Sequence, residues 1–380
     1  MAQSATASKK MKVFPRYQIS GTPYECGKAY GEQARQKIEV SIQKYRAVFI
    51  FYADWDWNKV LKYAEGFIAP IKEFDPEIIE ELQGIADGAG VNFLDILAIN
   101  TRTEIMFAAK ARDKSMKLPE SLECSSFAVR SDPQNILIGE NWDWLSHCED
   151  TVVILEASPL NQPKYVTVVE AGLLAKFGMN SQGLGIATNA LISSLDKGEP
   201  GVPYHVLLRS LLKAGNTIEG IVLINKGFRS SSANYLLADK HGTLIDVETM
   251  TGEWKEVGYI MPNSDHALIH TNHFITDRFV EFDITPGWIP STLFRYHRIK
   301  NAISEPTDLA NPEFWKETLC GHINLPYGVC SHHGPNDREE ERFSTITSAI
   351  MNLSDQTIEL TAGRPCECEY VKLDYADFLT

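Results

Sequence analysis

The sequence predicts an antiparallel, layered α+β protein in which a helical N-terminal third precedes a β-rich body. Residues 27–113 carry apolar side chains at three- and four-residue spacings, the pattern of amphipathic helices. After residue 124, short alternating or β-branched runs follow one another with few helical segments between them. Such a succession of strands favours a layered α+β fold over a doubly wound one. No G-x-G-x-x-G or P-loop motif opens a βα unit.

The bulk properties are those of a globular protein that does not bind nucleic acid. The chain has 380 residues, of which 44% are hydrophobic and 23% charged, enough for two domains or one large unit. A formal net charge of −14 argues against a nucleic-acid surface, which needs clustered Lys and Arg. No apolar run is long enough to span a membrane, and MAQSATASKK lacks the apolar core of a signal peptide. We therefore expect a cytoplasmic protein without membrane contacts.

Two stretches of the first third predict helices: GKAYGEQARQKIEVSIQKYRAVFIFYA and PEIIEELQGIADGAG. Gly88 and Gly90 are expected to end the second helix, and Asn92 to cap a further one in NFLDILAINTRTEIMFAA. The polar stretch ARDKSMKLPESLE, residues 111–123, predicts an exposed loop.

The body of the chain is predicted to consist mainly of strands. Helical periodicity returns only around residues 204–225 and 292–302. The predicted strands are SSFAVR, NILIGENW, DTVVILEAS, KYVTVVEA, GLGIAT, ANYLLAD, GTLIDVE, ALIHTNHF and TIELTAG.

The cysteines indicate reduced thiols rather than a disulfide framework, because they are odd in number and spread along the chain. They are Cys26, Cys124, Cys148, Cys320, Cys330, Cys366 and Cys368. Cys366 and Cys368 lack the two-residue spacing of a zinc knuckle, and no Cys/His pair lies near them in the sequence. We therefore predict no metal site.

The stretch SSFAVRSDPQNILIGENWDW predicts a β-hairpin with its turn centred on Pro133 and Gln134. The numbers of opposed residues then sum to about 267, which sets Cys124 opposite Asp143 at roughly 4.5–5.5 Å between Cβ atoms. A register slip of one residue would instead set Cys124 against Trp142 or Trp144.

A carboxylate beside a thiol raises the pKa of the thiol, so the predicted pairing of Cys124 with Asp143 needs a further group between them. The α-amine of Cys124 would serve if the chain were cut between Glu123 and Cys124, because a partly neutral amine can take the thiol proton. The alternative is that Cys124 is a small buried hydrophobic residue without a catalytic role.

Several motifs occur here in an order that resembles the acyl-coenzyme A:6-aminopenicillanic acid acyltransferase-like family of N-terminal nucleophile hydrolases. The resemblance runs from about residue 18 to about residue 372. The motifs are GTPYECGKAYGEQ, ELQGIADGAGV, ILAINTRTEI, ECSSF, GENWDW, GMNSQGLGIATNAL, HTNHF and TITSAIMNLSDQTIELTAGRPC.

The resemblance implies a precursor that cuts itself before a cysteine and folds as a four-layer αββα sandwich. Residues 1–123 would form a helical α chain that stays bound to the β chain, residues 124–380. The new N-terminal cysteine would attack the carbonyl of a small N-acyl amide or acyl thioester. The resemblance implies no cofactor, with acyl-coenzyme A as a potential substrate, and is compatible with a homo-oligomer.

The family's functional residues carry over to specific positions of this chain. Cys124 resembles the nucleophile, at the cleavage site Glu123–Cys124, and Asp143 resembles the group that orients its amine. Asn272 and Asn189 are similar to side-chain donors to the oxyanion of the tetrahedral intermediate. Two further residues, His270 and Ser126, are candidates for substrate contacts.

One departure from the family pattern leaves the activity open. The residue before the nucleophile is usually Gly, which eases a strained backbone, whereas here it is Glu123. Hydrolysis of an N-acyl amide is the leading hypothesis and coenzyme A-dependent transfer is the second. A third is an unprocessed scaffold of the same fold that binds a ligand without chemistry.

Overall fold

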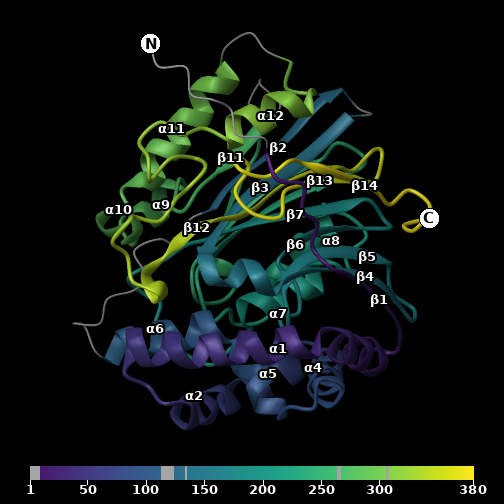
Figure 1. Ribbon diagram of the computed structural model, residues 1–380, viewed down its shortest axis with the longest axis vertical. Helices are drawn as coiled ribbons and strands as arrows, with labels where there is room; N and C mark the ends of the chain where they lie inside the picture. The colour runs from purple at the N-terminus through teal and green to yellow at the C-terminus, as the bar shows by residue number, and fades with distance from the viewer. Residues whose placement is uncertain (1–8, 113–123, 133–134, 263–266, 305–307) are drawn as a thin grey trace.

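The computed structural model describes residues 9–112, 124–132, 135–262, 267–304 and 308–380. Two sheets lie face to face, with helices on both outer sides, so that the predicted αββα sandwich is confirmed (Figure 1). The loop predicted over residues 111–123 begins two residues later than expected, because Ala111 and Arg112 belong to the helix Arg102–Arg112. The rest of that stretch, with the cleavage-site residue Glu123, and the hairpin turn at Pro133 and Gln134 lie outside the described residues.

The first helical layer is formed largely by the N-terminal third, as predicted, and covers the outer face of the larger sheet (Figure 1). Its N-terminal helices are α1 (Pro23–Ala53), α2 (Trp57–Ala64), α3 (Ile68–Phe74), α4 (Pro76–Ala89), α5 (Phe93–Asn100) and α6 (Arg102–Arg112). Two later helices, α7 (Tyr204–Leu211) and α8 (Thr217–Asn225), complete this layer, whereas the sequence predicts one continuous helix over 204–225.

Helix ends in the first layer follow the capping residues. Gly90 ends α4 with a φ of 73°, and Asn92 begins α5 with a capping box to Asp95, as predicted. The expectation that Gly88 also ends the helix was wrong, because Gly88 lies inside α4 where that helix contacts α1.

The larger sheet runs β1-β4-β5-β6-β7-β8-β9-β10. Its strands are β1 (Arg16–Gly21), β4 (Val152–Pro159), β5 (Tyr165–Glu170), β6 (Phe177–Asn180), β7 (Leu184–Ala190), β8 (Ala233–Asp239), β9 (Leu244–Thr249) and β10 (Val257–Ile260). All the described pairs are antiparallel except β1 with β4. Strands β1, β6 and β10 are short and were not predicted.

The smaller sheet runs β11-β2-β3-β12-β13-β14 and carries the second helical layer on its outer face. Its strands are β2 (Cys124–Asp132), β3 (Asn135–Leu145), β11 (Ala267–His270), β12 (Phe343–Asn352), β13 (Thr357–Leu360) and β14 (Val371–Asp374). The covering helices and their neighbours are α9 (Asp277–Val280), α10 (Thr285–Trp288), α11 (Ser291–Ser304) and α12 (Pro312–Leu319). Phe127 of β2 stacks on Trp315 of α12, with 3.6 Å between ring centroids.

The β2–β3 register differs from the prediction by one residue. Asp132 pairs with Asn135, as the expected turn requires, but the register shifts between Arg130 and Asp132. Beyond that irregularity Cys124 pairs with Trp142, so the predicted pairing with Asp143 was wrong.

Helices α1 and α4 pack with their backbones in contact, because glycines line both sides of the crossing. A Cβ atom on Gly31 would lie 2.3 Å from the carbonyl oxygen of Ile85, and one on Gly84 would lie 2.2 Å from that of Tyr24. Backbone atoms cannot move aside as a flexible side chain can.

We predict that Gly31→Ala lowers the free energy of unfolding by about 1–3 kcal/mol, measured by denaturant titration. The matched control is Gly287→Ala, since nothing lies within 4 Å of a Cβ atom at that position. Equal stabilities of the two variants would contradict the close packing of α1 on α4.

Candidate active site

Cys124 begins β2 and lies between the two sheets, 4% exposed. Its backbone N–H donates to Oδ1 of Asn272 at 2.8 Å, and its carbonyl oxygen accepts from Nη1 of Arg295 at 2.7 Å. The N–H and the carbonyl of Cys124 are therefore both held by side chains from residues 272–295, the segment that follows β11 in the chain.

The thiol borders a small cavity of about 30 Å³, roughly the space of a water molecule. Residues of both proposed chains form its wall. They are Arg102, Thr103, Cys124, Trp142, Asp143, Trp144, Lys176, Ala190, Tyr204, His205 and Ser232.

A buried ion pair lies beside the thiol. Nζ of Lys176 is 3.5 Å from Oε1 of Glu140 and 4.0 Å from Sγ of Cys124. The same ammonium donates to the hydroxyl of Tyr204 and to the carbonyl of Thr188, both at 3.3 Å. This pairing compensates two charges that would otherwise be costly to bury.

Burial raises the pKa of the Cys124 thiol to about 12, although the positive charge of Lys176 lowers it. Burial by itself lowers the pKa of Lys176, but the opposing effect of Cys124 and Glu140 raises it overall. The uncut chain therefore holds a neutral thiol beside an ammonium at neutral pH, and Lys176 cannot act as the base.

Asp143 presents its carboxylate away from the inner face of the hairpin, because its neighbours Trp142 and Trp144 alternate with it along β3. Its Oδ1 accepts from Oγ1 of Thr345 at 2.5 Å. The backbone N–H of Asp143 donates to the Cys124 thiol and lowers its pKa. Asp143 therefore lies next to Cys124, although the residue directly opposite Cys124 in the β2–β3 pair is Trp142.

Asn272 contacts Cys124 directly, as an acceptor rather than as a donor. Its Oδ1 accepts from Cys124 and also from Nη2 of Arg295 at 3.0 Å, while its Nδ2 donates to the carbonyl of Ala190 at 3.0 Å. These contacts suit a group that holds the amine of Cys124. The role of Asn272 as a donor to an oxyanion stays a prediction.

Asn189 and Ser126 contact each other between the sheets. Oγ of Ser126 donates to Oδ1 of Asn189 at 2.6 Å, and Nδ2 of Asn234 donates to the same oxygen at 3.1 Å. Nδ2 of Asn189 donates to the carbonyl of His270 at 3.5 Å. This network joins β2 of one sheet to β7 of the other and thereby fixes the strand that begins with Cys124.

Both ring nitrogens of His270 are engaged within the protein. They contact the carbonyl of Thr271 and Oε1 of Glu248, each at 2.7 Å. Burial by itself lowers the pKa of His270, but the carboxylates of Asp246 and Glu248 outweigh burial and raise it to about 9. These contacts give His270 a structural role as a buried cation.

The side chains around Cys124 that the sequence did not predict as site residues include Lys176, Arg295 and Tyr204. A lone Lys in the apolar run GLLAKFGM was the one available signal for Lys176. Arg295 lies among other basic residues of FRYHRIK, and nothing in that pattern distinguishes it. Arg102 also lines the cavity, where its guanidinium contacts Glu170 at 3.1 Å and lies over the ring of Trp144.

The family described as acyl-coenzyme A:6-aminopenicillanic acid acyl-transferase has a model that matches residues 129–367. The chain belongs to this family. The match begins after Cys124 and includes Asp143, Asn189 and Asn272. Membership confirms the resemblance found in the motifs and the general enzyme class, acyl transfer or amide hydrolysis.

Two relatives are similar over nearly their whole length. The chain is 24% identical over 351 residues to the 40 kDa form of acyl-coenzyme A:6-aminopenicillanic-acid-acyltransferase of Emericella nidulans, covering 91% of each chain. It is 23% identical over 397 residues to the β-alanyl-dopamine/carcinine hydrolase of Drosophila melanogaster, covering 94% of this chain and 96% of the relative.

Among solved structures, penicillin V acylase from Agrobacterium tumefaciens is 14% identical with a TM-score of 0.47, covering 68% of this chain and 88% of that one. The C2A mutant of conjugated bile acid hydrolase from Clostridium perfringens is 15% identical with a TM-score of 0.46, covering 67% and 93%. Within the described ranges, the helices are all too short or too polar to cross a bilayer.

We predict that His270 contributes pH-dependent stability. Because its pKa is raised from 6.5 to about 9 in the folded state, its contribution is fully present below pH 6.5 and is lost as the pH rises through 9. The difference in free energy of unfolding between the wild type and His270→Gln should therefore shrink between pH 6.5 and pH 9. A difference that stays constant over that range would contradict a buried His270 cation.

Proposed function

We propose that the protein is a self-processing cysteine amidohydrolase or acyltransferase that acts on small N-acyl amides through an acyl-Cys124 intermediate. The observation that carries the proposal is the setting of Cys124. Its N–H contacts Asn272, its carbonyl contacts Arg295, and its thiol borders a cavity next to an ammonium group. A cut before Cys124 would convert the held N–H into a held α-amine.

In the processing step, Sγ of Cys124 attacks the carbonyl carbon of Glu123. The Glu123–Cys124 C–N bond breaks as the S–C bond forms, and the proton lost by the thiol ends on the nitrogen, which becomes the α-amine. Water then hydrolyses the thioester, which leaves a carboxylate on Glu123 and a free thiol on Cys124. Arg295 and Asn272 would hold the Cys124 backbone in place through both steps.

In turnover, the α-amine of Cys124 takes the thiol proton and Sγ attacks the substrate carbonyl. The leaving amine receives that proton, and water or a second amine resolves the acyl-enzyme. Oδ1 of Asn272 accepts a hydrogen bond from the α-amine, and Lys176 stabilises the thiolate electrostatically. Asn189 would act indirectly, by fixing β2 through Ser126.

The two proposed chains have enough mutual contacts to remain together after the cut. Arg102 pairs with Glu170, and Glu81 pairs with Arg209 at 3.0 Å, with all four side chains buried. Nδ2 of Asn100 donates to the carbonyl of Gly172 at 2.8 Å. One hydrophobic core runs through both parts of the chain.

For the substrate we propose an N-acyl or aminoacyl amide of a small amine, with hydrolysis as the activity. The relative from Drosophila melanogaster is named as a hydrolase of β-alanyl-dopamine and carcinine, which supports an aminoacyl amide. The family description and the Emericella nidulans relative support coenzyme A-dependent acyl transfer as the second candidate.

A second cavity supports the proposal that the substrate carries an apolar group. It measures about 380 Å³ and is lined by Trp288, Ile289, Pro290, Ser291, Phe294, Asn324 and Tyr327. Ser291 and Arg295 lie about one turn apart on α11, so this cavity is close along the helix to the side chain that holds Cys124. We propose that it receives the apolar part of the substrate.

We predict that the purified wild type consists of two chains, the longer beginning Cys-Ser-Ser-Phe, and that Cys124→Ala abolishes both cutting and turnover. Denaturing mass spectrometry and N-terminal sequencing measure the cut, and release of free amine from a panel of N-acyl amides measures turnover. Cys148→Ala, which removes another buried thiol, is the matched control and should be cut normally. A wild type that stays intact would favour the non-catalytic scaffold.

We predict that removing the Lys176 charge makes the Cys124 thiol less acidic. The double variant Glu140→Gln/Lys176→Met removes both charges of the buried pair, so that neither is left unpaired. Because Lys176 lowers the pKa of the thiol more than Glu140 raises it, alkylation of Cys124 by iodoacetamide near neutral pH should slow several-fold in the double variant, whereas Lys176→Arg should retain most of the rate. An unchanged alkylation rate in the double variant would show that Lys176 does not make the Cys124 thiol more acidic.

A further inference from the structure

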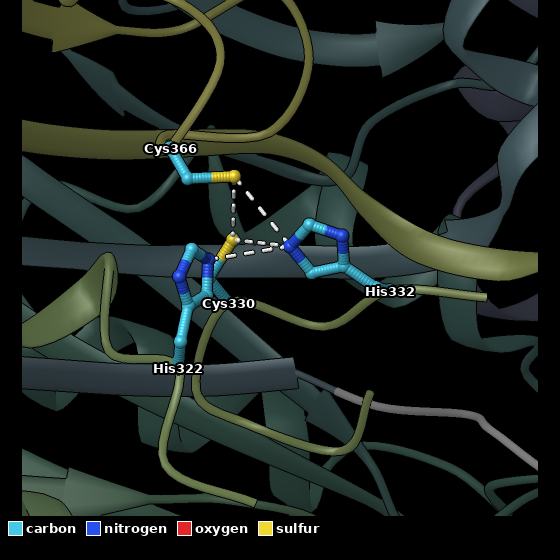
Figure 2. Close-up of side chains that lie close together, drawn as sticks. All are labelled: His322, Cys330, His332 and Cys366. Atoms are coloured by element: carbon cyan, nitrogen blue, oxygen red, sulfur yellow. Dashed lines mark hydrogen bonds between the residues drawn. The ribbon is translucent and has the colours of Figure 1, made fainter. Parts of the chain in front are cut away.

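Four potential metal ligands converge at the outer side of the smaller sheet, away from the Cys124 cavity. They are His322, Cys330, His332 and Cys366, whose ligand atoms all lie within 4.8 Å of one another (Figure 2). Three come from the loop between α12 and β12, and Cys366 comes from the segment after β13. Cys330 is buried and the other three are partly buried.

Four of the six distances between the ligand atoms are close to the edges of a tetrahedron around one ion, and the other two are below 4.8 Å. Sγ of Cys330 is 3.6 Å from Sγ of Cys366, and Nε2 of His332 is 3.3 Å from Nε2 of His322. Nε2 of His332 is 3.6 Å and 3.5 Å from the sulfurs of Cys330 and Cys366. Zn–S and Zn–N bonds of about 2.3 and 2.0–2.1 Å give tetrahedral edges of about 3.8 Å (S–S), 3.6 Å (S–N) and 3.3 Å (N–N).

A disulfide and an iron–sulfur cluster both fit these distances less well than a single ion does. A disulfide needs about 2.05 Å between sulfurs, far less than the 3.6 Å between Cys330 and Cys366. A two-iron cluster with His and Cys ligands on separate irons would set the imidazoles further from the thiolates. The four ligand atoms also face one common centre (Figure 2), where a cation would be stabilised by the lone pairs of two thiolates and two imidazoles.

We propose that His322, Cys330, His332 and Cys366 bind one structural Zn²⁺ ion with tetrahedral Cys₂His₂ coordination. Two thiolates and two imidazoles form a closed set of four ligands, as structural zinc sites have. Binding releases the two thiol protons to solvent, and the ion keeps its oxidation state. The inference does not depend on the proposed catalytic activity.

The spacing of the ligands along the chain does not predict this site, because they come from separate segments. Cys366 and Cys368 are near neighbours in the sequence but diverge in space: Sγ of Cys368 donates to the carbonyl of Ala362 at 3.2 Å. Cys330 and His332 flank Ser331, which forms an isolated bridge with Tyr327 in a tightly turned loop. That turn brings His322 back beside His332. The proposal of a zinc ion therefore departs from the prediction of no metal site.

The ion would fix a loop that supports Asp143. Between the ligands Cys330 and His332, Ser331 donates its N–H to Oγ1 of Thr345 at 2.9 Å, and that hydroxyl donates to Asp143. The carbonyl of Val329, the residue before the ligand Cys330, accepts a hydrogen bond from Nδ2 of Asn141 at 2.8 Å. Zinc would thus anchor the outer side of β3, the strand that lies beside Cys124.

The test is the zinc content of untagged protein, measured by inductively coupled plasma mass spectrometry. We expect about one equivalent in the wild type, and loss of most of it in Cys366→Ser and in His332→Gln. The matched controls are Cys368→Ser and His333→Gln, which alter neighbouring residues outside the cluster and should retain zinc.

A second measurement uses the wild type and does not depend on whether a variant folds. Protein stripped with a chelator should lose thermal stability and regain it with Zn²⁺, and Co²⁺ should give the intense visible absorption of a tetrahedral thiolate site. Wild type that contains no zinc and takes up neither metal would overturn the proposal. Peptide mapping that finds a Cys330–Cys366 disulfide in the purified protein would also overturn it.

Discussion

The pairing of β2 with β3 is the constraint on which the rest of the site depends. With Cys124 opposite Trp142, the inner face of the hairpin carries Cys124, Ser126 and Glu140 towards the larger sheet. On the outer face, Asn141 contacts α12 of the second helical layer and Asp143 contacts Thr345 of β12. A slip of one residue would exchange the two faces and separate the thiol from Lys176.

The state of the thiol follows from that placement. Burial between two sheets raises the pKa of the Cys124 thiol. The positive charge of Lys176 offsets only part of this effect, and the carboxylate of Glu140 acts in the same direction as burial. The amine released by a cut would lie where the Cys124 N–H already contacts Asn272. Cleavage would therefore supply the missing base without moving the nucleophile, so that a poorly reactive thiol could become part of an enzyme.

Periodicity and motif order predicted the layers and most of the long strands, because these depend on local patterns; the role of Cys124 stays a prediction. The hairpin register failed at one irregularity between Arg130 and Asp132, a feature that no local pattern marks. Lys176 and Arg295 were missed because their importance comes from tertiary contacts with a residue more than fifty positions away. The cluster around Cys366 was missed for the same reason, since its other ligands lie on a different loop.

The central claim is that the acyl group is carried by an N-terminal Cys124. The most direct measurement is acid quenching of the enzyme during turnover of an N-acyl amide or acyl thioester, followed by peptide mapping. We expect the mass of the acyl group on Cys124, in a peptide whose first residue is Cys124. An acyl group on another residue, or on a Cys124 still joined to Glu123, would contradict the claim.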